Sequence, residues 1–86
     1  MLSNILTDKD LSTSEKVVLL YLIDKGGNSK LDITFKQLEK ELSMTRPTIV
    51  KAIKGLEEKH LIKKENNFYN GIIQANTYKV NLFKYN

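Results

Sequence analysis

Cysteine is absent from this chain of 86 residues, and proline, histidine and arginine each occur only once. Without cysteine the protein can form neither a disulfide nor a thiolate metal site, so apolar packing must hold its fold together. The longest apolar run spans residues 17–23, far fewer than the roughly 20 residues that a membrane-spanning helix needs. The chain does not begin with a signal-peptide pattern. We therefore expect a cytoplasmic protein with no membrane partner.

The residue patterns of an active site are missing as well. The sequence shows no nucleophile constellation, no phosphate-binding loop and no metal-ligand spacing. Its one histidine, His60, follows a predicted helix, and we interpret it as a helix-end residue in preference to a metal ligand or a catalytic group. The sequence therefore predicts a protein that is not an enzyme and that needs no cofactor.

The positive charge of the chain is concentrated in its second half. Residues 1–42 contain six lysines and seven acidic residues, for a net charge of −1. Residues 43–86 contain seven lysines, one arginine and three glutamates, for a net charge of +5. This asymmetry indicates a polyanionic partner, with nucleic acid favoured over a membrane surface.

The stretch from Ser43 to Leu61 predicts a helix with two different faces. Thr45 is suited to cap its start, because its hydroxyl can accept a hydrogen bond from a first-turn amide, and Pro47 is tolerated in the first turn. At 100° per residue the apolar face consists of Ile49, Ala52, Ile53 and Leu56. The opposite face consists of Pro47, Thr48, Lys51, Lys54 and Glu58. Arg46 lies at the helix start, and arginine is the side chain that makes bidentate contacts with guanine. Such a helix suits a major-groove reader, but an ordinary amphipathic surface helix has the same two faces.

Capping patterns predict two further helices before this one. Ser12 with Glu15, and Thr34 with Gln37, each form a capping box, so we expect helices from residue 12 to about 25 and from residue 34 to 42. The second of these and the helix after residue 45 are joined by a short turn, which is a helix-turn-helix.

Shorter elements are expected around these helices. Residues 31–33 are compatible with a very short strand. The helical spacing of Leu2, Ile5 and Leu6 predicts one or two turns docked on the core.

After residue 60 the hydrophobic period becomes that of a strand. Residues 61–65 begin one strand and residues 76–82 alternate as a second. Asn66-Asn67 and Asn70-Gly71 are turn signals, so we predict a hairpin with a long tip from about residue 67 to 75. Together these elements define an α+β fold of three helices and a two- to three-stranded hairpin, in a single domain over residues 1–86.

This order of elements, with the run TRPTIVKAIKGLEEKHLI from residue 45, resembles the winged helix-turn-helix family of bacterial DNA-binding proteins. The run LSTSEKVVLLYL from residue 11 is similar to the first helix of that family. The similarity is greatest to the helix-turn-helix modules of plasmid and phage replication initiators, and it covers about residues 11–82. It implies a sequence-specific double-stranded DNA-binding protein that serves plasmid or phage replication, partition or transfer, or transcription regulation.

The resemblance also implies where DNA would be contacted. The helix over about residues 45–60 would enter the major groove, and the hairpin over about residues 61–82 would be the wing near the backbone or minor groove. The residues expected to contact DNA are Thr45, Arg46, Thr48, Lys51, Lys54, Lys63 and Lys64. A lysine pair on a strand can equally serve as edge protection, so the role of Lys63 and Lys64 has two interpretations.

Two departures from the family pattern bear on these roles. The family commonly has glycine where this chain has His60, which would then take a left-handed cap conformation. Residues 67–74 contain no lysine or arginine, which leaves open an alternative: a winged-helix module that binds protein through an apolar wing. A single domain of this size covers little DNA, so we expect a homodimer or side-by-side binding on repeated sites.

Overall fold

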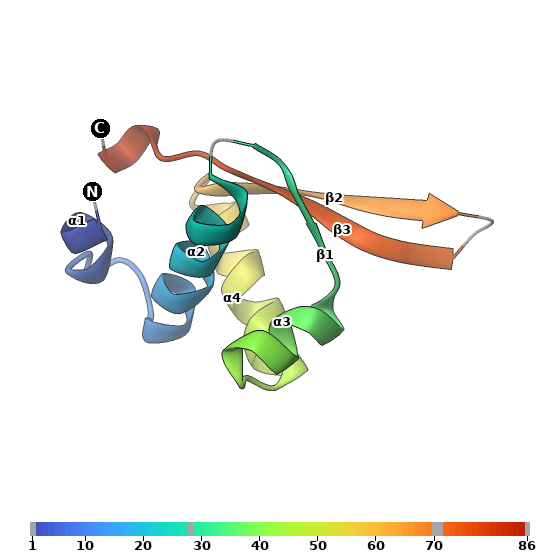
Figure 1. Ribbon diagram of the computed structural model, residues 1–86. Helices are drawn as coiled ribbons and strands as arrows, with labels where there is room; N and C mark the ends of the chain where they lie inside the picture. The colour runs from blue at the N-terminus through green and yellow to red at the C-terminus, as the bar shows by residue number, and fades with distance from the viewer. Residues whose placement is uncertain (1, 28, 70–71, 86) are drawn as a thin grey trace.

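The fold is a layer of helices on one face of a small antiparallel sheet (Figure 1). The computed structural model describes residues 2–27, 29–69 and 72–85, and of residues 2, 67–69 and 72–74 it describes the backbone alone. The elements in order are α1 (Leu2–Leu6), α2 (Thr13–Gly26), β1 (Leu31–Ile33), α3 (Phe35–Leu42), α4 (Arg46–Glu58), β2 (Ile62–Tyr69), β3 (Ile72–Val80) and the 3-10 helix η1 (Phe83–Tyr85). The predicted α+β class is confirmed, and the short strand at residues 31–33 is confirmed with it.

The helices α2 and α3 begin at the predicted capping boxes. The Ser12 hydroxyl accepts a hydrogen bond from the Glu15 amide at 3.1 Å, and the Glu15 carboxylate accepts one from the Ser12 amide at 2.8 Å. Thr34 and Gln37 make the same reciprocal pair at 3.1 and 3.0 Å. Because each box satisfies two otherwise unpaired groups, these local sequences fix where the helices start.

The core forms where α2, α3 and α4 meet the sheet. The four apolar residues predicted for the inner face of α4 are all buried, as are Leu38 of α3 and Tyr78 of β3. In α1 the side chain of Ile5 is fully buried, which confirms that this turn docks on the core. Leu6 is 54% exposed, so Ile5 and not Leu6 makes the contact with the core. A helix of only five residues turns one narrow face inward, and Ile5 occupies it.

The hairpin is more regular than the sequence predicts. The sheet order is β1-β3-β2, and β2 and β3 remain paired out to Tyr69 and Ile72. The predicted long tip over residues 67–75 is therefore wrong. Asn66 pairs with Asn76 in place of starting a turn. Between this pair and the pair of Phe68 with Ile73, two residues of β3 lie opposite one residue of β2, so a bulge takes up the extra residue without ending the strand. The turn predicted at residues 70–71 lies outside the described residues.

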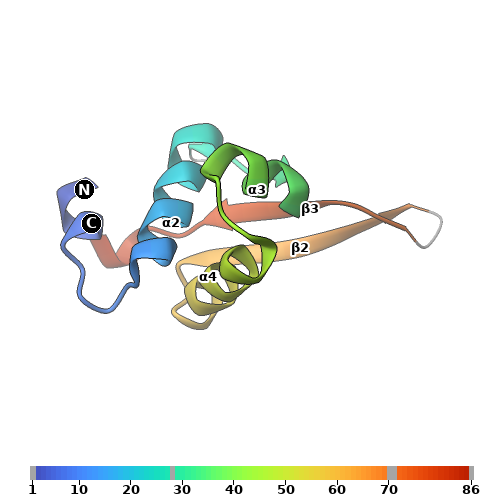
Figure 2. The same cartoon turned by 90° about the horizontal axis from the view of Figure 1, so that it is seen from below.

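Figures 1 and 2 show the hairpin extending past α3 and α4, while both chain ends lie at the opposite end of the molecule. Those ends are joined through Asp8, which accepts hydrogen bonds from Lys84 Nζ at 2.8 Å and from the Tyr85 hydroxyl at 2.7 Å. The bond from Lys84, followed by that from Tyr85, holds the pKa of Asp8 well below its usual value. The segment before α2 and the segment after β3 are therefore fastened together, away from the hairpin.

Candidate nucleic-acid interface

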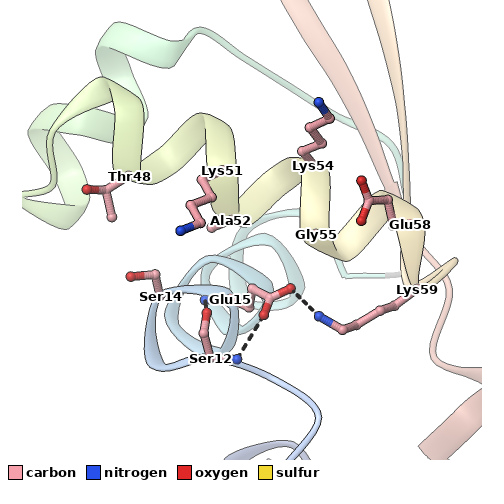
Figure 3. A pocket seen from close by; sticks show the side chains of 10 residues that line it. All are labelled: Ser12, Ser14, Glu15, Thr48, Lys51, Ala52, Lys54, Gly55, Glu58 and Lys59. Carbon is pink, nitrogen blue, oxygen red and sulfur yellow. Dashed lines mark hydrogen bonds and ion pairs between the residues drawn. The ribbon is translucent and has the colours of Figure 1, made fainter.

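The outer face of α4 is polar and exposed, as predicted. Thr48, Lys51 and Lys54 are all exposed on it, while Ile49 and Leu56 are fully buried on the inner face. Figure 3 shows Lys51 directed toward the start of α2 and Lys54 directed to the other side of α4. Within the described part of the chain neither lysine forms an ion pair, so both ammonium groups are available to an anionic partner.

Thr45 occupies the N-cap position of α4, but its side chain does not cap the helix. Its backbone has cap geometry, with φ −74° and ψ 156°, yet its hydroxyl is hydrogen-bonded to the Thr48 hydroxyl at 2.9 Å. The predicted bond to a first-turn amide is therefore wrong. A cap side chain can accept a hydrogen bond from the amide of the second or third helical residue, and Pro47, the second, has no amide hydrogen. The third residue is Thr48, whose hydroxyl takes the place of its backbone amide as the partner of the Thr45 hydroxyl. Both hydroxyls are consequently exposed together where the helix begins.

The side chain of Arg46 is exposed, but contacts with α3 hold it in place. Its Nε and Nη2 donate hydrogen bonds to Glu39 Oε2 of α3 at 3.2 and 3.0 Å, and its side chain is 54% exposed. Its guanidinium carbon lies 5.7 Å from the ring centroid of Phe35, the first residue of α3. Lys64 Nζ lies 5.7 Å from the same centroid. The structure thus brings together two predicted contact residues, Arg46 and Lys64, around the ring of Phe35.

Lys63 and Lys64 do not share a surface. Lys64 is paired in register with the buried Tyr78, on the face of the sheet that the helices cover. Lys63 is paired with Lys79, so it lies on the opposite face, where it lines a recess of about 180 Å³ together with Lys30 and Lys79. The predicted lysine pair is therefore divided: Lys64 joins the site at the start of α4 and Lys63 does not.

A groove of about 640 Å³ separates the start of α2 from α4 (Figure 3). At its floor Lys59 Nζ donates to Glu15 Oε2 at 2.7 Å, and Glu15 is 7% exposed. Burial raises the pKa of Glu15, but the hydrogen bonds from Lys59 and Ser12 outweigh it and leave the pKa below its usual value. Because Glu15 neutralises Lys59, Lys51 is the lysine that brings positive charge to the side of the groove facing α2.

Close packing of α2 against α4 depends on Gly55. A Cβ at this position would overlap Glu15 Oε2 and lie 3.1 Å from Glu15 Cδ. Alanine normally stabilises a helix interior by about 0.5–1 kcal/mol relative to glycine. Here we expect Gly55→Ala to lower the free energy of unfolding by about 1–2 kcal/mol, because Glu15 must leave its hydrogen bonds to make room.

Urea unfolding at neutral pH measures this effect, and a double-mutant cycle supplies the control. In a Glu15→Ala background the Gly55→Ala change should become stabilising by about 0.5–1 kcal/mol, since the clash is gone. A stabilising Gly55→Ala in the natural background would contradict the packing role.

His60 ends the α4 region in the left-handed conformation expected of it, with φ 60°. The His60 amide donates to the Glu57 carbonyl and the Leu61 amide donates to the Leu56 carbonyl, both at 3.0 Å. These are the two hydrogen bonds of a Schellman motif. The interpretation of His60 as a helix-end residue is confirmed, and the motif directs the chain from α4 into β2.

A helix-turn-helix made of α3 and α4, followed by a hairpin and displaying exposed lysines on its second helix, defines the class of winged helix-turn-helix DNA-binding proteins. The sequence model of the MarR family matches residues 9–67, and the chain belongs to this family. Its members are DNA-binding regulators and not enzymes. No curated protein and no solved structure matches the chain.

Family membership places the chain among DNA-binding proteins of transcription regulation. The similarity to replication initiators and a plasmid or phage process are not supported by these matches and stay predictions. None of the described helices is long and apolar enough to cross a membrane. Among the same residues no cluster of three or more His, Cys, Asp or Glu side chains is arranged to hold a metal ion.

Proposed function

We propose that this protein is a sequence-specific transcription regulator whose helix α4 reads the major groove of double-stranded DNA, with the β2–β3 hairpin as a wing beside it. The observation that carries the proposal is the outer face of α4. This face displays two hydroxyls and two lysines that form no ion pair with any described residue, while the inner face is buried in the core. Donors near the start of an exposed helix are what base and phosphate contacts in the major groove require.

The contacts divide by chemistry. Arg46 is suited to guanine, since it alone offers parallel donors, and Thr45 and Thr48 are suited to bases or phosphates near the helix start. Lys51 and Lys54 are assigned to phosphates on the two sides of α4, and Lys64 to the backbone beside the wing. Lys63 lies on the face of the sheet opposite the helices, so it could contact DNA only if the phosphate backbone ran along that face.

We further propose that two copies bind together. Members of the MarR family usually bind DNA as dimers. In this chain Leu6 is 54% exposed and Phe83 is 82% exposed, on the two segments that meet at the end away from the hairpin. A dimer contact through these exposed apolar residues would leave the α4 surfaces of both copies free for DNA.

Selection of bound duplexes from a random-sequence library at near-physiological salt tests the proposal. We expect an enriched motif that contains guanine, arranged as an inverted repeat for a two-fold dimer or as direct repeats for side-by-side copies. Arg46→Ala should cost roughly 1–3 kcal/mol at one base position, whereas Arg46→Lys should keep general affinity and still lose that preference. No enrichment, with binding that disappears as salt rises, would contradict a sequence reader.

A further inference from the structure

We propose that Glu39 and Phe35 of α3 are positioning residues for Arg46, and that they hold its guanidinium with one complete donor edge open for a base. This inference rests on the proposed reading of DNA by α4. It assigns specificity in part to two residues that themselves contact no DNA.

The hydrogen bonds of Arg46 to Glu39 leave the end edge of its guanidinium free for a base. A guanidinium has five N–H donors in a fixed plane. Glu39 Oε2 accepts from Nε and from Nη2, which together form the side edge of the group. The end edge, formed by Nη1 and the second hydrogen of Nη2, meets no acceptor within the described residues. Two parallel donors on one edge are what bidentate recognition of guanine O6 and N7 needs.

The platform beneath Arg46 is itself fixed. Phe35 is partly buried and packs against the core, which restricts the movement of its ring. Its π face attracts the guanidinium of Arg46, whose carbon lies 5.7 Å from the ring centroid. Lys64 Nζ is at the same distance from that centroid, which adds a second cation beside the arginine. Glu39 offsets this local positive charge, and the 54% exposure of the Arg46 side chain leaves room for a ligand.

The opposite role for Glu39 would be sequestration, in which the carboxylate competes with DNA for Arg46. A sequestering acid must give up its bonds before the arginine can bind a base. Here the bonds to Glu39 and a bidentate contact to guanine use different edges, so both can exist at once. The two roles predict opposite changes in guanine preference when Glu39 is replaced by alanine. Glu39→Ala weakens the preference if Glu39 positions Arg46 and strengthens it if Glu39 sequesters Arg46.

The first test needs no DNA. Arg46 is the only arginine in the chain, so its Nε–H resonance in a ¹⁵N-labelled sample is unambiguous. We expect a rigid Nε–H in the natural protein, seen in its heteronuclear NOE, and a mobile one in Glu39→Ala. Glu41→Ala removes the same charge from an exposed position of the same helix and should leave the signal rigid. A Glu39→Ala protein in which the Arg46 signal stays rigid would overturn the positioning role.

The second test measures base preference on the selected duplex, with 7-deazaguanine replacing the guanine assigned to Arg46 so that its N7 acceptor is lost. Glu39→Ala should reduce the discrimination between the two duplexes by about three- to tenfold, because an unheld arginine loses side-chain freedom on binding. Glu39→Gln, which keeps an acceptor oxygen, should restore part of it, and Glu41→Ala should change nothing.

The outcomes separate the two proposals. Unchanged or increased discrimination in Glu39→Ala, with Arg46→Ala losing it, overturns the positioning role and leaves the proposed function intact. If Arg46→Ala itself leaves the discrimination unchanged, the assignment of Arg46 to a base is wrong, and the contribution of Glu39 to specificity is wrong with it.

Discussion

Truncating Ile53 to alanine is expected to lower the free energy of unfolding by about 2–5 kcal/mol. Ile53 is 1% exposed on the inner face of α4, where the removed atoms would leave a cavity between the helices. Domains of this size have a total stability of roughly 5–15 kcal/mol, so the loss is a large fraction of the whole. For 60–100 residues it corresponds to a fall in melting temperature of roughly 8–40 °C, which differential scanning calorimetry measures directly.

Val50→Ala is the matched control, because it also shortens a β-branched side chain on α4. Val50 is 40% exposed, and alanine has the higher helix propensity, so we expect a change within about 0.5 kcal/mol. Equal losses in the two variants would mean that α4 is not anchored through its inner face, and the assignment of its outer face to DNA would lose its basis.

The parts of the fold that could be predicted are those that short stretches of sequence determine. A capping box involves residues three apart, so the starts of α2 and α3 could be read before any tertiary contact was known. The two faces of α4 follow from its own periodicity. The hairpin tip could not be found this way, because Asn66-Asn67 has the composition of a turn. Pairing with β3 on both sides of a bulge, which is a cross-strand effect, overrides that local preference.

The same limit applies to the candidate site. Thr48, Lys51 and Lys54 were predictable because they share one helix face. The cluster of Phe35, Arg46 and Lys64 draws on α3, α4 and β2, and no spacing along the chain relates them. Sequence reasoning treated Lys63 and Lys64 as one pair, although neighbouring residues of a strand point to opposite faces of the sheet.

The double change Lys51→Ala with Lys54→Ala is expected to weaken binding to the selected duplex on the order of 30-fold for each bound protomer at 0.15 M salt. If each lysine neutralises one phosphate, each loss forfeits the release of about one counterion, which is worth about fivefold at that salt concentration. The slope of log affinity against log salt should become shallower by about 2 for each bound protomer. Fluorescence anisotropy from about 50 to 200 mM salt yields both quantities.

Lys25→Ala with Lys30→Ala removes the same charge from the C-terminal end of α2 and the segment before β1, away from the outer face of α4. Screening over about 8 Å at physiological salt should limit its effect to less than about threefold. A slope that falls by only about 1 in the Lys51 and Lys54 double variant, with a changed selected motif, would assign one lysine to a base. Equal effects of the two double variants would mean that the lysines of α4 contribute only general attraction, and their assignment to phosphates beside α4 would be wrong.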